Sequence, residues 1–155
     1  MIVGAGLTGL LTAYRLQELG FGVTVLEARD RIGGRIHTLQ FGKAKVEMGA
    51  TWFNESHYHL LDVIEEFKVP YFEQFMTGKS YFQTFSNVPP QEIAVPNDSP
   101  SYRFKNGTIH LLNAINTKLK PNAVSTNEVV KHILVYENGA AIKTNTRTLN
   151  ADVII

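Results

Sequence analysis

The chain has 155 residues, 44% of them apolar, so it is long enough for one domain with a buried core. Fifteen Lys and Arg residues balance fourteen Asp and Glu residues without a basic block, which argues against binding to nucleic acid or to a membrane surface through a basic patch. The absence of cysteine excludes disulfides, thiol nucleophiles and a cysteinyl link to a cofactor.

The sequence predicts a cytoplasmic protein whose partner is a small molecule. No apolar run approaches the ~18 residues of a membrane span. The first residues, MIVGAG, lack the basic flank and cleavage site of a signal peptide. His57 and His59 have no further ligand at a standard spacing, so we expect no metal site.

A glycine-rich turn, GAGLTG at residues 4–9, follows Ile2 and Val3 almost at the start of the chain. Apolar residues then recur at helical spacing as far as Gly20, which predicts a helix over residues 7–19. The β-branched run at residues 23–26 predicts a strand parallel to the first one. We therefore predict a βαβ unit and a Rossmann-like α/β fold.

The glycines of this turn have separate predicted tasks. Gly4 allows the tight turn, Gly6 lets the backbone approach a pyrophosphate, and Gly9 lets the helix pack on the strand. The pyrophosphate is expected at the positive end of the helix, against the backbone of Gly6, Leu7 and Thr8. These features together predict a dinucleotide site.

The next stretch, EARDRIGGR at residues 27–35, indicates which dinucleotide binds. Glu27 ends the second strand, where a carboxylate can accept hydrogen bonds from the hydroxyls of an unphosphorylated adenosine ribose. The amides of Gly33 and Gly34 can face a pyrophosphate, and Arg35 can add charge-assisted hydrogen bonds. Because GGR has no role in a nicotinamide site, the pattern favours FAD.

These motifs resemble the flavin-dependent amine oxidase family, which includes monoamine, polyamine and L-amino-acid oxidases. EARDRIGGR has each element of the family pattern of glutamate, alanine, arginine, a hydrophobic residue and GGR. VEMGATWF (46–53) is similar to the segment that brings backbone up to the flavin ring. SYRFKNGTIHLL (101–112) and LNADVII (149–155) resemble later segments of the flavin domain.

The resemblance implies FAD as cofactor, an amine as substrate and further cofactor contacts. It implies that Arg29 clamps the adenosine side and that the backbone of Val130 meets the adenine. Asp30 and Arg31 are predicted to be structural. From the residue pattern and the resemblance together, the predicted cofactor-binding residues are Gly4, Gly6, Leu7, Thr8, Gly9, Glu27, Ala28, Arg29, Gly33, Gly34, Arg35, Gly49, Ala50, Thr51, Trp52 and Val130.

The middle of the chain predicts a hairpin over residues 36–47, turning at Gly42, and a helix over residues 57–68. The resemblance implies that residues 71–100 are a short remnant of the family's substrate-region insertion. We expect the aromatic residues of this stretch to be core residues rather than the lining of an amine pocket. They are Tyr71, Phe72, Phe75, Tyr81, Phe82 and Phe85.

The last third predicts a helix from Ile109 to Leu119 and an antiparallel meander of strands. The predicted meander strands are 124–126, 129–136 and 140–144, with Asn138-Gly139 as a two-residue turn. A final strand is predicted at residues 151–155, and its last three residues are expected to join the parallel sheet.

Three functions remain open at this stage. The first is an amine oxidase, in which a hydride passes from the amine's α-carbon to flavin, the imine hydrolyses and oxygen reoxidises the cofactor. The second is another FAD oxidoreductase, similar to phytoene desaturase or protoporphyrinogen oxidase, and the third is a non-catalytic nucleotide-binding fragment. Because both ends fall within predicted strands, we expect residues 1–155 to be a single domain that supplies mainly the ADP-binding half of an FAD site. No catalytic residue is assigned.

Overall fold

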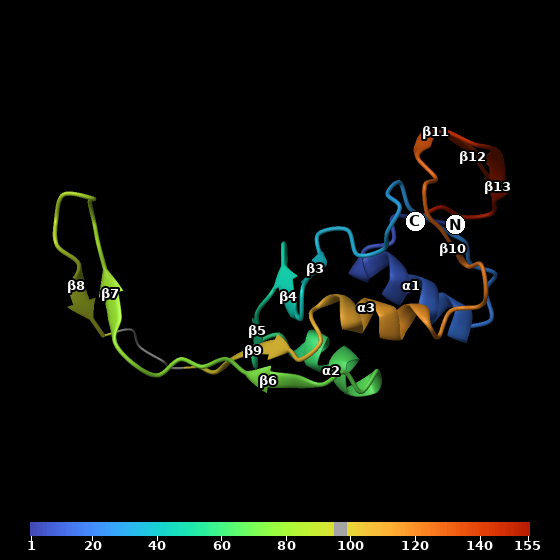
Figure 1. Ribbon diagram of the computed structural model, residues 1–155. Helices are drawn as coiled ribbons and strands as arrows, with labels where there is room; N and C mark the ends of the chain where they lie inside the picture. The colour runs from blue at the N-terminus through green and yellow to red at the C-terminus, as the bar shows by residue number, and fades with distance from the viewer. Residues whose placement is uncertain (95–98) are drawn as a thin grey trace.

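The computed structural model describes residues 1–94 and 99–155 (Figure 1). A βαβ unit begins the chain: β1 (Ile2–Val3), α1 (Leu7–Glu18) and β2 (Val25–Leu26). β1 and β2 pair in parallel, with Ile2 opposite Val25. The predicted helix and the predicted parallel pairing are confirmed.

β10 (Val124–Ser125) lies on the other side of β2 and is also parallel to it. The prediction that residues 124–126 open the antiparallel meander is therefore wrong. Val25 and Leu26 are fully buried, and Val25 donates a backbone hydrogen bond to Ala123 O at 2.7 Å. A buried strand needs backbone partners on both edges, and β10 supplies them on one side.

The end of the chain borders the other side of β1. Val3 N donates to Ile155 O at 2.8 Å, and Ile155 N donates to Met1 O at 2.9 Å. The predicted position of residues 153–155 beside the parallel sheet is confirmed by these bonds. The bounds of the predicted strand, 151–155, are wrong. Residues 152–155 do not form a regular strand, and Ala151 is the last residue of an antiparallel strand, Thr148–Ala151.

The antiparallel layer consists of β11 (Val130–Tyr136), β12 (Gly139–Thr144) and β13 (Thr148–Ala151). Tyr136 pairs with Gly139, so the two-residue turn is Glu137-Asn138 and the predicted Asn138-Gly139 turn is wrong by one residue. A Cβ on Gly139 would lie 2.9 Å from Ala151 O. The glycine therefore serves the close approach of β13, a strand that the sequence analysis missed.

The middle of the chain contains β3 (Thr38–Phe41), β4 (Ala44–Glu47) and α2 (Tyr58–Glu66). β3 and β4 form the predicted hairpin, with Gly42 at φ 58° in its turn. A small antiparallel sheet orders β5 (Phe53–Asn54), β9 (Ser101–Phe104) and β6 (Tyr71–Glu73). α3 (Ile109–Asn116) ends before the predicted Leu119, which lies in the turn that follows.

A second hairpin, β7 (Ser80–Phe82) with β8 (Gln91–Ile93), projects away from the rest of the molecule in Figure 1. The prediction that the aromatic residues of this region are core residues is wrong, since Phe75 is 82% exposed and Phe85 is 66% exposed. Tyr71 and Phe72 lie in β6 against β9, and the Tyr71 ring lies 5.3 Å from that of Phe53 between centroids. Residues 95–98 of the predicted insertion remnant lie outside the described residues.

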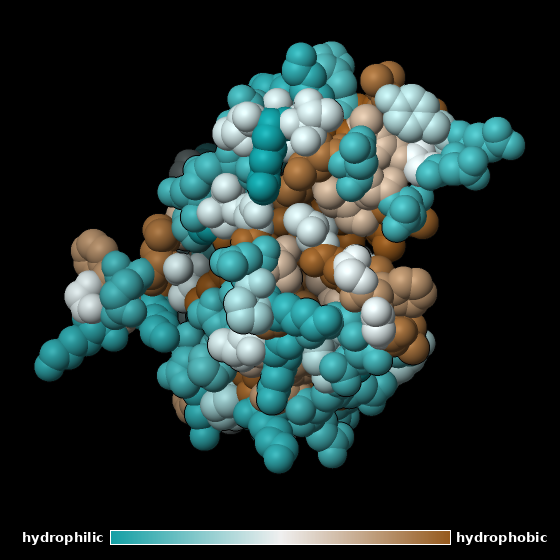
Figure 2. Space-filling model, turned by 90° about the vertical axis from the view of Figure 1, so that its right-hand side faces the viewer, coloured by the Kyte–Doolittle hydropathy of each residue, from teal (hydrophilic) through white to brown (hydrophobic). Residues whose placement is uncertain are grey.

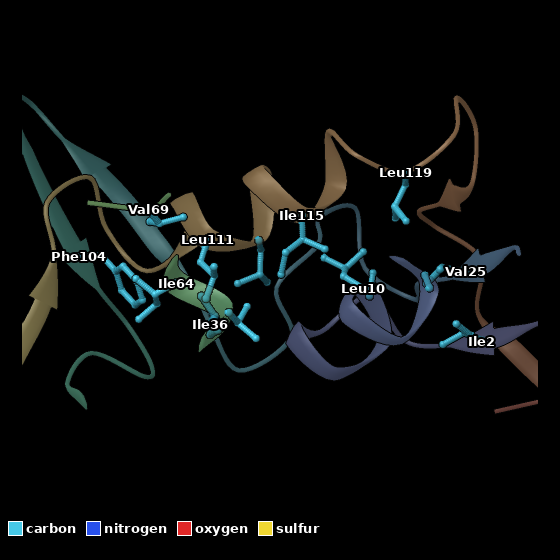
Figure 3. Close-up of a cluster of buried hydrophobic side chains, with 14 of the residues drawn as sticks. Ile2, Leu10, Val25, Ile36, Ile64, Val69, Phe104, Leu111, Ile115 and Leu119 are labelled. Carbon is cyan, nitrogen blue, oxygen red and sulfur yellow. The ribbon is translucent and has the colours of Figure 1, made fainter. Parts of the chain in front are cut away.

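The hydrophobic core runs from the parallel sheet through α1 to α3 and α2 (Figure 3). Ile2, Leu10 and Val25 lie at the sheet end of this cluster. Leu111 and Ile115 of α3 continue it toward Ile64 and Phe104 at the other end. At the end of the molecule shown in Figure 2, apolar surface is interspersed with polar side chains. The core thus fixes the start of α1 relative to the loops that follow β1 and β2.

Candidate functional site

Two glycine turns meet where β1 and β2 end. Gly33 N donates to Ala5 O at 2.8 Å, and Gly6 and Gly33 form a parallel bridge. A Cβ on Gly34 would lie 3.5 Å from the Cα of Gly6. The motif at residues 4–9 and the motif at residues 33–35 therefore form one backbone surface.

Two of these glycines leave no room for a side chain. A Cβ on Gly9 would lie 2.0 Å from Gly4 O, so α1 can pack on the turn after β1 only with glycine there, as predicted. Gly33 has φ 117°, and a Cβ on it would lie 2.4 Å from Ile36 O. The glycines at these positions are required by the backbone geometry itself.

A cavity of about 950 Å³, here called the cradle, opens against this surface. Its described lining includes three arginines and no Asp or Glu. α1 begins at the cradle with Gly6 as N-cap, and neither a side-chain cap nor an acidic residue lies in its first turn. The lining residues are Val3, Gly4, Gly6, Leu7, Thr8, Gly9, Arg29, Arg31, Gly33, Gly34, Arg35, Ile36, His37, Met48, Gly49 and Ala50.

The cradle has the chemistry that a pyrophosphate requires. The free N–H groups of the first helical turn carry a partial positive charge, which favours an anion at that point. Arginine side chains add charge-assisted, bidentate hydrogen bonds to phosphate oxygens. A dinucleotide cofactor therefore fits the residues that line the cradle.

Glu27 is 4% exposed and has a second task that the sequence analysis missed. Its Oε2 accepts from Ala5 N at 2.8 Å, and its Oε1 accepts from Arg29 N at 2.9 Å. The guanidinium of Arg29 lies 3.8 Å from Oε1. Each carboxylate oxygen keeps a lone pair for another donor, so these bonds and a ribose contact are compatible.

Arg31 holds the GGR loop in place, consistent with its predicted structural role. Its Nη1 donates to Ile32 O at 3.2 Å and to Ile36 O at 3.3 Å. Its Nη2 donates to Gly34 O at 3.3 Å. Arg31 also lines the cradle, which the sequence analysis did not predict, because only the folded loop turns its guanidinium back onto these carbonyls.

The segment similar to the flavin-ring wall lies against the same loop. A Cβ on Gly49 would lie 1.8 Å from Arg35 O, so the two segments are in backbone contact. Gly49 and Ala50 line the cradle together with Arg35. His37 and Met48 also line it and were missed, although each lies within two residues of a predicted position.

Five predicted residues do not line the cradle: Glu27, Ala28, Thr51, Trp52 and Val130. Trp52 is 67% exposed. Val130 begins β11, two residues after Glu128, whose N–H donates to Glu27 O at 2.9 Å. The neighbouring Asn127 N donates to Arg29 O at 2.8 Å, so this strand begins beside the strand end predicted to face the adenosine.

Within residues 1–94 and 99–155, no group of three or more His, Asp or Glu side chains is arranged to hold a metal ion. His57 instead accepts a hydrogen bond at Nδ1 from Asn54 N at 3.0 Å, just before α2. None of the helices in the described part of the chain has the length and apolar character of a membrane span.

A parallel βαβ unit with a glycine turn, a helix N-terminus and an arginine-lined cradle defines the class of dinucleotide-binding α/β proteins. Residues 7–94, more than half of the chain, match the model of the flavin containing amine oxidoreductase family. The chain belongs to this family, whose cofactor is FAD.

Several curated relatives resemble this chain. Flavin-dependent L-tryptophan oxidase of Lentzea aerocolonigenes is 42% identical over 81 residues, which cover 49% of this chain and 17% of the relative. Probable flavin-containing monoamine oxidase A of Dictyostelium discoideum is 28% identical over 124 residues, covering 79% of this chain and 27% of the relative. Putrescine oxidase of Kocuria rosea is 35% identical over 82 residues, covering 53% of this chain and 17% of the relative. The chain thus matches only a minor part of each relative's length.

Solved structures show the same fold. Putrescine oxidase bound to putrescine aligns with a TM-score of 0.87 at 17% identity, covering 99% of this chain and 56% of that chain. Cyclohexylamine oxidase from Brevibacterium oxydans aligns with a TM-score of 0.84 at 16% identity, with the same coverage. The predicted fold class, a Rossmann-like parallel sheet with an antiparallel β-layer, is confirmed.

Proposed function

We propose that this chain supplies mainly the ADP-binding half of the FAD site in an oxidase that acts on an amine. The cradle carries the proposal, because it joins two glycine turns, the open start of α1 and three arginines in one cavity. Membership of the flavin amine oxidoreductase family supports FAD as the occupant.

In this proposal the amides of Leu7 and Thr8 and the side chain of Arg35 bind the pyrophosphate. Glu27 accepts the ribose hydroxyls with the lone pairs that its two backbone bonds leave unused. The backbone of Val130, two residues after the Glu128 N–H that donates to Glu27 O, meets the adenine. Arg29 is proposed to clamp the adenosine side, and the backbone of Gly6, Gly33 and Gly34 to face the pyrophosphate.

The segment from Gly49 to Trp52 is proposed to form one wall of the flavin-ring site. When bound, FAD supplies the hydride acceptor for oxidation of the amine at its α-carbon and returns the electrons to oxygen. The task of the chain is to bind and orient, so no residue of it is assigned as an acid or base. We also propose that residues 1–155 form one FAD-binding domain, with 71–100 as a short remnant of the substrate-region insertion.

Titration with FAD tests the proposal. We expect the gene product that contains this chain to quench flavin fluorescence and to bind FAD more tightly than NAD⁺. Arg35→Met should weaken FAD binding about tenfold or more, since a charge-assisted hydrogen bond contributes about 1.5–3 kcal/mol. Lys118→Met, which removes an exposed charge that does not line the cradle, is the matched control.

Anaerobic mixing with amines then separates the possible functions. Bleaching of the flavin by a primary amine or amino acid supports the amine oxidase. Retention of FAD without bleaching by any amine supports another FAD oxidoreductase or a non-catalytic nucleotide-binding module. Equal affinity for FAD and NAD⁺, unchanged by Arg35→Met, would show that the cradle is not the cofactor site.

A further inference from the structure

A second cavity, of about 340 Å³, lies between the β3–β4 hairpin and the turn that leads from β9 into α3. We call it the cation cavity. The hairpin contributes Lys43 and Lys45, and the end of β9 with its following turn contributes Arg103 and Lys105. The protein as a whole has a formal charge of only +1, so this is a local concentration of positive charge.

Among the described residues, Glu47 is the only carboxylate that lines the cation cavity, and both of its oxygens already accept hydrogen bonds. Its Oε1 accepts from Thr108 N at 2.8 Å, at the start of α3. The hydroxyl of Thr38 lies 2.9 Å from Oε2 and 3.0 Å from Oε1. The negative charge of Glu47 therefore stabilises the α3 N-terminus.

The four cations have no carboxylate partner within residues 1–94 and 99–155. Lys45 is held in place, because its Nζ donates to Asn106 O at 2.9 Å. This bond ties the hairpin to the turn before α3, so that both pairs of cations line one cavity. An anionic ligand would neutralise part of this positive charge and accept hydrogen bonds from the cations.

The cation cavity and the cradle share a wall. Gly49 and Ala50 line the cradle, whereas the next residue, Thr51, lines the cation cavity. Thr108, also on the cation cavity, donates its hydroxyl to Ala50 O at 2.9 Å. The proposed function places this same segment beside the flavin ring, so the cation cavity adjoins the proposed ring wall.

We propose that the cation cavity binds the carboxylate of an amine substrate, so that the substrates are amino acids rather than polyamines. This inference rests on the proposed function. In an α-amino acid the carboxylate is attached to the carbon that is oxidised, so an anion site must adjoin the flavin-ring wall. A polyamine carries two or more positive charges at neutral pH, and Lys43, Lys45, Arg103 and Lys105 repel it.

Binding to the chain itself tests the cavity with a matched pair of ligands. L-Tryptophan and tryptamine differ only in the carboxylate, and putrescine serves as the polyamine. Calorimetry should detect L-tryptophan binding at least about tenfold tighter than tryptamine, and no binding of putrescine. Lys43→Gln with Lys105→Gln should abolish this preference, because it removes two of the four positive charges. The fold should be undisturbed, since neither lysine side chain makes a hydrogen bond within the described residues, and the backbone bond from Lys105 N to Pro70 O is unaffected.

Lys118→Gln with Lys120→Gln removes the same charge from the exposed segment after α3 and should leave the preference unchanged. Equal binding of L-tryptophan and tryptamine would overturn the inference. So would an equal loss of L-tryptophan binding in both double variants, because that would trace it to net charge rather than to the cavity.

Turnover by the FAD-loaded gene product separates this inference from the proposed function. Preferential oxidation of L-tryptophan, with KM raised by the Lys43 and Lys105 changes, supports both. Oxidation of tryptamine or putrescine as fast as L-tryptophan overturns the inference and leaves the proposed function intact. Bleaching by no amine overturns the proposed function, whatever the binding experiment gives.

Discussion

At the scale of single residues, Glu27 has both a structural and a proposed binding role near the cradle. Its carboxylate connects the turn after β1 with the loop after β2 by accepting one backbone N–H from each. A carboxylate can do this because both of its oxygens accept hydrogen bonds. The residue therefore shapes the site as well as carrying the charge proposed to face the ribose.

Glu27→Gln should weaken FAD binding and also lower the stability of the FAD-free protein. The amide keeps one acceptor but places an NH₂ against the N–H of Ala5 or Arg29, leaving one buried donor unpaired at a cost of about 1–3 kcal/mol. Urea unfolding and FAD titration measure the two effects separately. Glu137→Gln, in the exposed β11–β12 turn, is the control, and an unchanged unfolding free energy for Glu27→Gln would contradict the structural task.

Arg31 acts on the cradle through the carbonyls that it binds, so its replacement should loosen the GGR loop. In Arg31→Met, amide exchange at Gly33 and Ile36 should be about tenfold faster, because about 1.4 kcal/mol of local hydrogen bonding is lost. Arg31→Lys keeps the charge but not the planar guanidinium, so its amide exchange rates should lie between those of the wild type and of Arg31→Met. Unchanged exchange at both amides would show that the arginine does not hold the loop.

At the scale of elements, α1 and α2 are joined by a bidentate ion pair between Arg15 and Glu66. Arg15 Nη1 lies 2.6 Å from Glu66 Oε1, and Nη2 bonds to Oε2. The hydrogen bonds from Arg15 are the main cause that lowers the pKa of Glu66 below its usual 4.5. The folded state prefers the ionised carboxylate, so the ion pair stabilises the fold fully above about pH 4.5, the pKa of the unfolded state. This stabilisation is lost as the pH falls through the lowered pKa of the folded state.

Glu66→Gln should therefore destabilise the protein at pH 7 but not at pH 2. The pair is largely exposed, with side chains 50% and 31% accessible, so we expect a loss of about 0.2–1 kcal/mol at low salt. Urea unfolding of both proteins across this pH range measures the difference. A difference that stays constant down to pH 2, or that does not shrink in 1 M salt, would mean that packing rather than charge is responsible.

The contact between α1 and the turn after β1 depends on Gly9. Gly9→Ala should destabilise the protein by about 1–3 kcal/mol or more, since the added methyl group overlaps the carbonyl of Gly4 and forces α1 away from the sheet. Thermal unfolding measures the effect. Gly22→Ala is the matched control, because a Cβ at Gly22 meets no atom within 4 Å, and it should leave stability nearly unchanged. Equal behaviour of the two variants would contradict the close packing.

At the scale of the whole molecule, the chain corresponds to 56% of the putrescine oxidase chain with which it aligns. We expect the 155-residue chain, made alone, to hold FAD weakly and to oxidise no amine. A ligand with fewer contacts still loses its translational and rotational freedom, at a cost of ~4–15 kcal/mol. Catalysis needs reacting atoms held at ~3–3.5 Å, and this chain is proposed to provide only one wall of the ring site.

The visible spectrum of the purified chain and an assay of peroxide release with amines and amino acids measure these expectations. A yellow protein that turns over any of these substrates would contradict them. In that case the exposed aromatic residues between Tyr71 and Phe85 would be the leading candidates for a substrate pocket.

Local patterns in the sequence determined the βαβ unit, the first hairpin and both glycine motifs. The spacing of apolar residues in α1 and the β-branched run before Glu27 involve only residues that are close in sequence. Each pattern therefore predicts its helix or strand without knowledge of the rest of the fold. Most of the cradle follows from these motifs for the same reason, because glycines and arginines close in sequence must lie close in space.

Only the tertiary structure decided which segments lie together across long stretches of chain. β10 pairs with β2 rather than with the meander because the buried edge of β2 needs a partner, and no local pattern in Val124 and Ser125 encodes that choice. The exposure of Phe75 and Phe85 depends on what packs over them, not on their own hydrophobicity. The cation cavity likewise exists because Lys45 reaches the carbonyl of Asn106, and a contact across so many residues is set by the fold rather than by the neighbours of either residue.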